Sequence, residues 1–569
     1  MANERLLTDK TGQDIVKALE AIAITGGGSA QALDAVCEAM INGTNTSRVF
    51  NAWLPRAIVI EGPDADRYAL LCRFADFVSN AWKDKTYTLR NYKAEVSSET
   101  AITPLDDLAN MAAGQLCTES TKPVEDWVDE DPIGGWYVRA NALSLADGNM
   151  NITAFEGEEG FDTTGEEAPV YTFTIALWIK EWEDESYEYI SYRTTQAEGF
   201  YPDAGDVGLD GTKRAVTWHP TFPGALNSKG ALTSGAGRKA YNFASAEAGI
   251  TAARKMDAYE GLWNDCDTRW LLRMWQLRHF NLENSGIAEG CTNYNLQYQL
   301  ALAETGVKRV LLSTTNGANF VAGSTVSIGT RSAGNSDRGQ ASMRDIADLI
   351  KISSIETVNV NGNNYTALNL ELTENINTAT TYYVSTMPWH SGSTEVLPGH
   401  KDGCVHSLTA GKGPLRVAGV EVLDGAYAIG LDPLYNCTTG SGSGKFNYAV
   451  HECRDSEKLA GSITSNYKAT GITYTDMPQG WQYVKAFVKC RLGVLFPRLI
   501  GGSSTAYYKS AFRGTNSAGV RCPWRFAGLS GAGYAGLACG AGYHTPSGAY
   551  WFGRPRLCGS GKKRGEWTE

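Results

Sequence analysis

The spacing of apolar residues predicts three short helices within the first 85 residues. Apolar side chains recur at helical intervals from Asp14 to Ile22 and again from Leu33 to Met40. A third helix is predicted after Pro63, where one side carries six apolar residues: Leu70, Leu71, Phe74, Phe77, Val78 and Ala81. We expect residues 1–85 to form a helical region that self-associates, attaches the chain to a partner, or caps the next domain.

Strand-like patterns dominate residues 86–210, which we predict to be a β-rich domain. Val170 to Ile179 and Tyr187 to Tyr192 are rich in aromatic and β-branched residues and flank an acidic turn. From 245 to 284 the pattern is helical again, with a broad apolar stripe on Trp270, Leu271, Met274, Leu277 and Phe280. His279 lies on this helix without a second histidine nearby, which favours a packing role over a metal-ligand role.

Residues 301–403 differ from the segments around them and are predicted to be an inserted small β domain. Phe320 to Gly329 indicates a strand, and Ala341 to Lys351 a short helix. Ile355 to Leu372 indicates a hairpin that turns at Asn361-Gly362, the strongest short hairpin signal. After Gly399 the chain returns to short strands joined by loops rich in Gly and Ser.

Composition sets the last 69 residues apart from the rest. They hold 15 of the 62 glycines, and they carry nine Lys or Arg against two Glu in a chain whose net charge is −11. A 28-residue run from Phe526 to Gly553 has no charge, yet it contains Tyr534, Tyr550 and Trp551 among its aromatic residues. Glycine mixed with aromatic residues indicates an ordered, loop-rich surface suited to contact.

Several apparent motifs lack the context that their chemistry needs. Gly531 to Gly536 matches G-x-G-x-x-G, but the residues after it are too rich in glycine for the helix that binds a pyrophosphate. Gly440 to Lys445 resembles a phosphate loop with the wrong spacing. His390, His400, Cys404 and His406 cluster without two paired ligand turns, so we predict no metal there.

Charged segments give no stronger signal. The acidic loop from Glu156 to Glu167 offers oxygen ligands for a structural calcium ion, but it lacks the Asp-x-Asp-x-Asp-Gly pattern and is interpreted as a solvated acidic face. The basic residues at 562–564 flank the aromatic run instead of alternating with it, which argues against nucleic-acid binding. No segment has 18 apolar residues and no signal peptide is apparent, so we expect no membrane insertion, synthesis in a cytoplasm, and reduced cysteines.

The C-terminal end resembles a known family. Leu495-Phe-Pro-Arg-Leu-Ile-Gly-Gly-Ser-Ser-Thr-Ala-Tyr-Tyr508, Ala518-Gly-Val-Arg521, Gly536-Leu-Ala and Gly553-Arg-Pro-Arg-Leu557 are similar to the end of variable proteins diversified by phage retroelements. The resemblance implies an α+β chain with a C-type lectin fold of the formylglycine-generating-enzyme type. Trp218-His-Pro-Thr-Phe and the Trp270 helix look like its first half, so a split lectin domain is expected over 211–300 and 404–569.

In that family a reverse transcriptase rewrites adenines, mostly in Asn-type codons, and the altered side chains contact the target. Such codons reach Tyr, His, Ser, Gly, Ala, Phe and Leu but not Trp, so Trp524 and Trp551 are expected to be fixed framework residues. The resemblance implies a ligand-binding variable face, for which we predict Ala527, Leu529, Ser530, Ala532, Tyr534, Tyr543, His544, Gly548, Ala549, Tyr550 and Phe552.

The function expected from this resemblance is that of a phage receptor-binding adhesin on the virion tail. It would bind a bacterial surface protein or glycan, contact other tail proteins, form a homotrimer, and need no cofactor. The formylglycine-generating enzymes of this fold use a reactive cysteine pair. Here Cys522, Cys539 and Cys558 stand in a region expected to vary, so catalysis is not expected. The alternatives are a tail-associated polysaccharide-degrading enzyme, with carboxylates from 156–188, and a structural or decoration protein of the virion.

Overall fold

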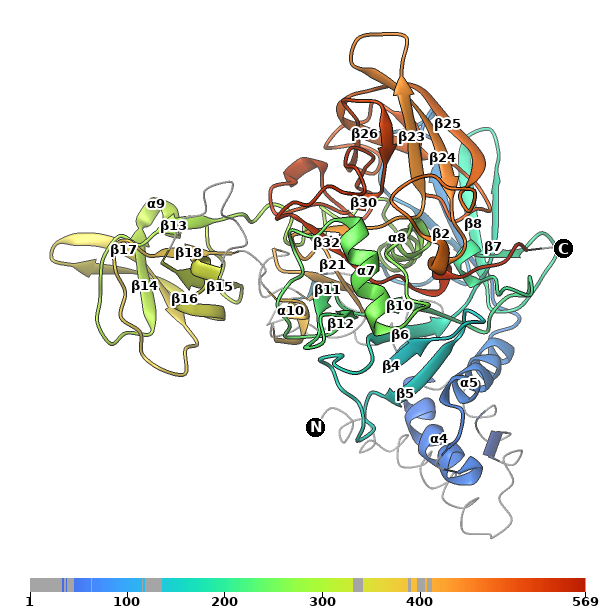
Figure 1. Cartoon of the computed structure of the whole chain (residues 1–569), viewed down its shortest axis with the longest axis horizontal. Helices are drawn as coiled ribbons and strands as arrows, with labels where there is room; N and C mark the ends of the chain where they lie inside the picture. The colour runs from blue at the N-terminus through green and yellow to red at the C-terminus, as the bar shows by residue number, and fades with distance from the viewer. Residues whose placement is uncertain are drawn as a thin grey trace.

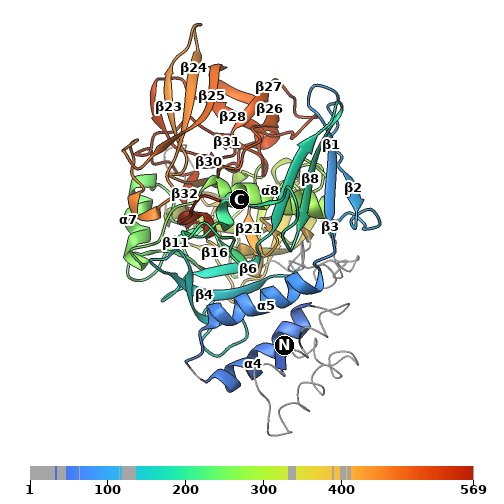
Figure 2. The same cartoon turned by 90° about the vertical axis from the view of Figure 1, so that its right-hand side faces the viewer.

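The computed structural model describes residues 33–34, 37, 46–62, 64–114, 116–117, 136–330, 341–386, 390–396, 405–406 and 412–567. Within these ranges helices occur together with sheets that are mostly antiparallel, so the predicted α+β class is confirmed. Figure 1 shows a large body with one sheet projecting to its left, and Figure 2 shows the body from the side. No helix in the described ranges is long and apolar enough to cross a membrane.

Two helices lie at the N-terminal end of the described chain: α4 (Thr46–Glu61) and α5 (Arg67–Ala81). Asp66 caps α5 by accepting hydrogen bonds from two backbone N–H groups. The Phe74 ring lies 4.9 Å from that of Phe50 and 5.2 Å from that of Trp136, so the two helices pack on each other and on the sheet beneath them (Figure 2). The helix predicted after Pro63 is therefore confirmed, whereas the one predicted from 14 to 22 lies outside the described residues.

The sheet beneath α5 has the strand order β10 (Val216–Pro220), β6 (Val170–Ile175), β4 (Val138–Ser144), β5 (Met150–Phe155). A second sheet beside it has the order β2 (Thr103–Asp106), β1 (Tyr87–Tyr92), β8 (Tyr187–Arg193), β7 (Trp178–Glu183), β9 (Tyr201–Pro202). The apolar run from Val170 to Ile179 therefore contributes to both sheets, because the chain leaves the first sheet after Ile175 and enters the second at Trp178.

The middle of the body holds helices α7 (Ala246–Met256) and α8 (Asp265–His279). Every residue of α8 is buried, so the stripe predicted on one side of this helix covers only part of the packed surface. Short pairs complete this region: β11 (Gly224–Leu226) with β12 (Leu232–Ser234), β20 (Leu415–Val417) with β21 (Val420–Val422), and β3 (Leu116–Cys117) with β19 (Val405–His406). His279 packs as predicted, with its Nδ1 2.7 Å from the carbonyl oxygen of Gly114.

Two sheets form the upper part of the body in Figure 1. One has seven strands in the order β27 (Pro497–Ile500), β26 (Gly480–Phe487), β28 (Ala511–Gly514), β31 (Gly540–Ala541), β30 (Trp524–Arg525), β22 (Tyr427–Ile429), β32 (Gly553–Pro555). The other has the order β25 (Lys468–Pro478), β24 (Lys445–Glu452), β23 (Leu434–Thr439), β29 (Gly519–Arg521). One hydrophobic cluster extends from Leu33 to Leu557, so segments before and after residues 85 and 210 share a core.

The projecting sheet is built from residues 297–385 and has its own apolar cluster. Its order is β13 (Gln297–Gln299), β18 (Tyr383–Ser385), β15 (Thr325–Gly329), β16 (Ala347–Val360), β17 (Asn363–Leu370), β14 (Arg309–Ser313), and α9 (Thr314–Gly317) follows β14. The hairpin at Asn361-Gly362 is confirmed, because β16 and β17 pair around these two residues and both have positive φ. The helix predicted over 341–351 is wrong: only a turn of 3₁₀ helix forms before β16, where pairing with β15 buries Ile352.

Basic residues near the C-terminus are buried against acids from earlier in the chain. Arg564 lies 2.9 Å from a carboxylate oxygen of Asp432 and 3.2 Å from one of Glu452, and all three side chains are at most 4% exposed. Lys562 lies 3.3 Å from Glu260 in the same interior. Burial and the neighbouring Glu452 raise the pKa of Asp432 to about 6, although Arg564 opposes the shift. The C-terminal tail therefore supplies cations that pair with buried carboxylates in the core of the body.

We expect the Arg564→Met variant to be destabilised by about 3–5 kcal/mol, because it leaves buried Asp432 without its cation and leaves Glu452 with Arg454 alone, 2.6 Å away. Urea unfolding at pH 7.5 measures the loss, and the deficit should shrink toward pH 5 as the orphaned Asp432 carboxylate takes up a proton. Lys229→Met is the matched control: Lys229 and its partner Glu167 are 62% and 75% exposed, so the change should cost less than about 1 kcal/mol. Equal losses in the two variants would contradict this account.

Candidate ligand-binding face

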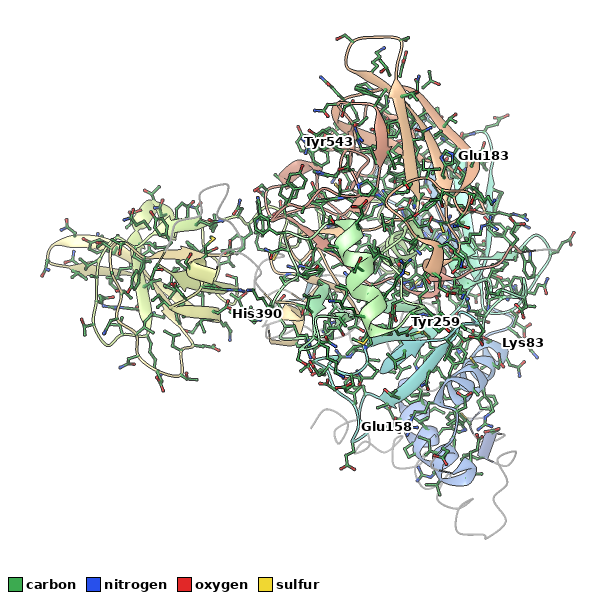
Figure 3. The ribbon with its side chains drawn as sticks, in the orientation of Figure 1. Lys83, Glu158, Glu183, Tyr259, His390 and Tyr543 are labelled. Carbon is green, nitrogen blue, oxygen red and sulfur yellow. The ribbon has the colours of Figure 1, made fainter. Side chains whose placement is uncertain are left out.

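The predicted contact residues differ in exposure. Five are exposed: Ser530, Ala532, Tyr534, Ala549 and Tyr550. Three are half-buried: Tyr543, Gly548 and Phe552. The remaining three are buried: Ala527, Leu529 and His544. The loops after β30 and β31 thus bring most of the predicted residues to one surface, where Figure 3 labels Tyr543 in the upper part of the body.

The prediction of a contact role is wrong for Ala527 and Leu529, because their side chains are only 0% and 1% exposed. Ala527 is packed so closely against the Gly531 backbone that a Cβ on Gly531 would lie 2.6 Å from its methyl group. Leu529 belongs to a small cluster with Cys291 and Met343, and half-buried Trp551 packs against it. These two residues anchor the loop instead of contacting a ligand.

His544 is also a packing residue, 5% exposed. Its ring is stacked on the fully buried Trp524 with 4.0 Å between centroids, and its Nδ1 is buried without a hydrogen-bond partner among the described residues. Burial lowers the pKa of His544 to about 3, and Arg513 and Arg521 add to the effect. The imidazole is therefore neutral at pH 7 and packs as an aromatic ring against its neighbours.

A chain of ring contacts joins four segments on this surface, and we call it the aromatic row: Trp481, Tyr483, Arg513, Tyr534, Tyr543, His544, Tyr550 and Phe552. Tyr534 is stacked on Trp481 at 5.2 Å with 5° between the ring planes, and lies 5.3 Å from Tyr483. The Arg513 guanidinium lies 5.7 Å from the Trp481 ring and 4.0 Å from the Tyr543 ring.

The aromatic row continues through His544. Tyr543 lies 5.0 Å from His544, His544 lies 5.0 Å from Tyr550, and Tyr550 is stacked on Phe552 at 5.3 Å. Phe243 adds a fifth segment: its N–H donates to the Tyr550 carbonyl over 3.2 Å, it is 42% exposed, and its φ is +56°. A bulky residue held exposed with positive φ is uncommon away from functional surfaces.

Sequence reasoning missed Trp481, Tyr483, Arg513 and Phe243. The first three face the same side because Trp481 is paired with Arg513 in the β26–β28 register, and Tyr483 is two residues further along β26. The spacing of Trp481 and Tyr483, two residues apart along β26, was the sequence signal that could have indicated these two positions. The glycines of this region serve close packing: a Cβ on Gly542 would lie 2.8 Å from Phe512 and 3.0 Å from Tyr448.

The remaining candidate motifs have structural roles. Gly531–Gly536 contains a 3₁₀ turn, and the next described elements are the strands β31 and β32 instead of the α-helix that a dinucleotide fingerprint requires. Gly440 and Lys445 close the turn between β23 and β24 through a 2.8 Å backbone hydrogen bond. His390 pairs with Asp348 at 2.6 Å, whereas His400, Cys404 and the side chain of His406 lie outside the described residues.

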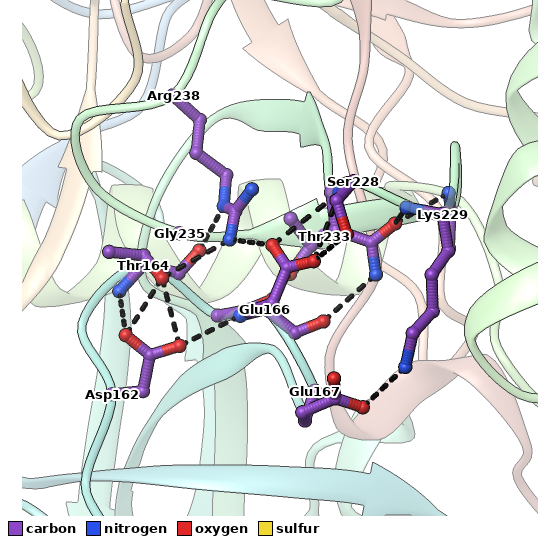
Figure 4. A network of polar contacts seen from close by, with 12 residues as sticks. Asp162, Thr164, Glu166, Glu167, Ser228, Lys229, Thr233, Gly235 and Arg238 are labelled. Atoms are coloured by element: carbon purple, nitrogen blue, oxygen red, sulfur yellow. Dashed lines mark hydrogen bonds and ion pairs between the residues drawn. The ribbon is translucent and has the colours of Figure 1, made fainter.

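The acidic loop is tied to the neighbouring loop (Figure 4). Asp162 accepts hydrogen bonds from the Thr164 hydroxyl over 2.7 Å and from the Glu166 N–H over 2.9 Å. Glu166 contacts Ser228 and Arg238. These partners occupy the oxygens that a cation would need, and among the described residues no group of three or more His, Cys, Asp or Glu side chains is arranged to hold a metal ion.

The ten described cysteines are free thiols. Cys522, Cys539 and Cys558 are all buried, and burial raises the pKa of Cys522 and of Cys539 to about 12. Such thiols are protonated at pH 7 and are poor nucleophiles. The three cysteines of the C-terminal region therefore have the character of packing residues.

No protein-family model matches the chain, and no curated protein is significantly similar to it. The geometry of the described residues is therefore the basis for assigning a function.

The neutral His544 makes the binding face sensitive to acid. Because its folded pKa lies below the unfolded value of about 6.5, its contribution is full above pH 6.5 and is lost as the pH falls toward 3. We expect His544→Phe, which keeps the stack on Trp524 and leaves no hydrogen bond unmade, to lose about 2 kcal/mol less than the wild type between pH 6.5 and 4.5. Urea unfolding followed by tryptophan fluorescence measures both slopes, and parallel slopes would refute the assignment.

Proposed function

We propose that this chain is a receptor-binding adhesin of a bacteriophage virion and that its C-terminal face binds a protein or glycan of the bacterial surface. The aromatic row carries the proposal. Rings from separate segments meet on one surface, and Tyr534 and Tyr550 remain 38% and 43% exposed although each is stacked on a neighbour. Rigid aromatic side chains supply contact area at low entropic cost, which suits recognition of a partner.

The proposal includes a C-type lectin fold made from two separated parts of the chain. Its support is the close joining of residues 211–300 with residues 412–567: the Trp263 N–H donates to the Arg556 carbonyl over 2.7 Å, and Leu262 forms a β-bridge with Leu557. The exposed predicted residues lie in loops on this unit. Side chains there can change at little cost to the core, which is what diversification by a retroelement requires.

A binding role is favoured over a catalytic one. Glycoside hydrolysis needs a carboxylic acid of raised pKa beside a carboxylate. In the segment from 156 to 188 the shifts run the other way: hydrogen bonds and ion pairs lower the pKa of Glu166 and of Glu181, and Lys489 with Lys93 lowers that of Glu183 to about 2. These carboxylates serve as partners for cations and hydroxyls.

A trimer on the tail completes the proposal. Each face is small and offers a shallow row of rings, so a single contact is expected to be weak. Three copies on one fibre would raise the overall affinity by roughly 10² to 10⁴ through effective concentration. Size-exclusion chromatography with light scattering measures the number of copies directly.

The central test replaces exposed rings of the row. We expect Tyr534→Ala combined with Tyr550→Ala to lower binding of the labelled protein to host cells at least tenfold, because aromatic anchors dominate such interfaces. The matched control is Tyr189→Ala: this half-buried ring is stacked on Trp182 at 4.9 Å on another sheet. Unchanged binding of the double variant, or an equal loss in the control, would disprove the assignment of the face.

Diversification makes a prediction about the neighbouring DNA. We expect a near-identical copy of the codons for about 505–557 beside a reverse transcriptase gene. Differences at adenines should affect the codons of exposed residues such as Ser530, Ala532 and Ala549, and should spare those of buried Ala527 and Leu529. Sequencing of the locus decides this, and a chain without such a copy would still be tested as an adhesin by the ring variants.

A further inference from the structure

The C-terminal part of the chain has an unusual supply of positive charge. From Met477 to Gly565, 89 residues contain 13 Lys or Arg and no Asp or Glu. Eight of these cations form ion pairs with carboxylates from earlier segments: Lys489, Arg498, Lys509, Arg525, Arg554, Lys562, Lys563 and Arg564. Arg556 is buried and donates to the carbonyl oxygens of Glu421 and Pro220. Most of the positive charge is therefore paired with acids from earlier in the chain, and five of the eight paired cations, Arg525, Arg554, Lys562, Lys563 and Arg564, are buried.

Three of the four remaining cations, Lys485, Arg513 and Arg521, have no carboxylate within ion-pair distance among the described residues. The fourth, Arg491, is exposed and lies 4.4 Å from the Tyr201 ring. Arg521 is buried and donates to the hydroxyl of Thr515 and to carbonyl oxygens of its own loop. Lys485 and Arg513 are half-buried and reach the surface, where they lie over aromatic rings: Lys485 over Tyr507, and Arg513 over Trp481 and Tyr543.

Lys485 belongs to the same side of β26 as the aromatic row. Trp481, Tyr483 and Lys485 alternate with the buried residues Val484 and Ala486, so the three side chains share one face over about 13 Å of strand. Arg513 is the cross-strand partner of Trp481. The surface thus combines stacked rings with two cations that have no carboxylate within ion-pair distance in the described part of the chain.

We propose that the ligand of this face is an acidic glycan, with Arg513 and Lys485 contacting its carboxylate or phosphate groups and the rings of Tyr534, Trp481 and Tyr483 contacting its sugar rings. The inference rests on the proposed function and adds the chemical class of the ligand. Arginine forms short, charge-assisted hydrogen bonds with carboxylates and phosphates, and a ring already stacked beside it holds the guanidinium in place.

The geometry favours a glycan over an acidic peptide. Tyr534 is stacked on Trp481 and remains 38% exposed, so part of its ring is accessible to the C–H face of a sugar. A peptide would gain most from an unpaired strand edge. The row lies over β26 and β28. In the described residues β28 pairs with β26 and β31, and β26 pairs with β27 from Val484 to Phe487, so the strand edge left for a peptide is confined to the start of β26.

The division of the site between fixed and variable segments follows from the same placement. Arg513, Lys485, Trp481 and Tyr483 lie before residue 527, in strands that belong to the sheet. Tyr534, Tyr543 and Tyr550 lie in the loops of the predicted variable segment. The fixed residues would then set the class of the ligand, while the variable loops would select one acidic glycan among many.

The test uses the full-length protein on an array of glycans printed in matched pairs: oligogalacturonides with their methyl esters, sialyllactose with lactose, and mannose phosphate with mannose, together with poly-glutamate. We expect at least tenfold stronger retention on acidic members than on their neutral partners, with a marked loss between 50 and 500 mM NaCl. Arg513→Gln should lower this retention about tenfold. Arg90→Gln, which removes a cation 4.5 Å from the Tyr187 ring on another sheet, should change it less than twofold.

Equal retention on acidic and neutral partners, no retention on any glycan, or an unaffected Arg513→Gln variant would overturn the proposal. Retention on poly-glutamate with the same Arg513 dependence would replace the glycan with an acidic protein. Comparison with the Tyr534→Ala variant distinguishes an error in the ligand class from an error in the location of the face. If Tyr534→Ala abolishes binding to host cells while Arg513→Gln preserves it, only the ligand class is wrong; if both variants bind normally, the face itself is wrong.

Discussion

The pairing of buried charges between the two ends of the body is the constraint on which the rest of the structure depends. Arg525 on β30 lies 2.6 Å from Asp265 at the start of α8, and both side chains are at most 1% exposed. Desolvating such a pair costs free energy, and removing either partner would leave an unpaired charge buried in the core. It therefore specifies how the C-terminal strands meet α8 more than it adds to stability. The backbone of Leu495 and the hydroxyl of Tyr435 complete the same contact.

This constraint explains how a surface of loops can be rigid. The strands that carry the rings are held from below by Arg525 and by Phe512, which packs in an aromatic cluster with Phe496 at 5.3 Å. Glycines allow these layers to approach closely, so the glycine excess of the tail reflects tight packing as much as turns. The rings above, including Tyr534, can then stay exposed without collapsing onto the core. Exposure of apolar area in a fixed position is what a recognition surface needs.

Local patterns were sufficient for α5, α8 and the hairpin at Asn361, because each depends on residues close together in the chain. They were insufficient for the site. Leu529 packs with Met343 from the 3₁₀ turn before β16, and Trp481 of β26 stacks on Tyr534 from a loop more than 50 residues later. Neither contact has a local signature. The predicted segment after β30 thus contributes Tyr534 to the aromatic row, while the burial of individual side chains and the contribution of β26 depended on tertiary packing.

The basic residues from Met477 to Gly565 contribute both to ion pairs in the core and to the charge of the aromatic row. The acids of the body lie upstream of Met477, and most of them that are buried meet cations from the tail, as Asp432 meets Arg564. A tail with equal numbers of acids and bases could not neutralise them. Among these cations, Lys485 and Arg513 lie beside the aromatic rings and have no carboxylate within ion-pair distance among the described residues, so each adds positive potential at the aromatic row. In the proposed function, Arg513 and Lys485 would attract the anionic groups of the ligand, and the exposed rings beside them would favour a ligand that also has a flat apolar face.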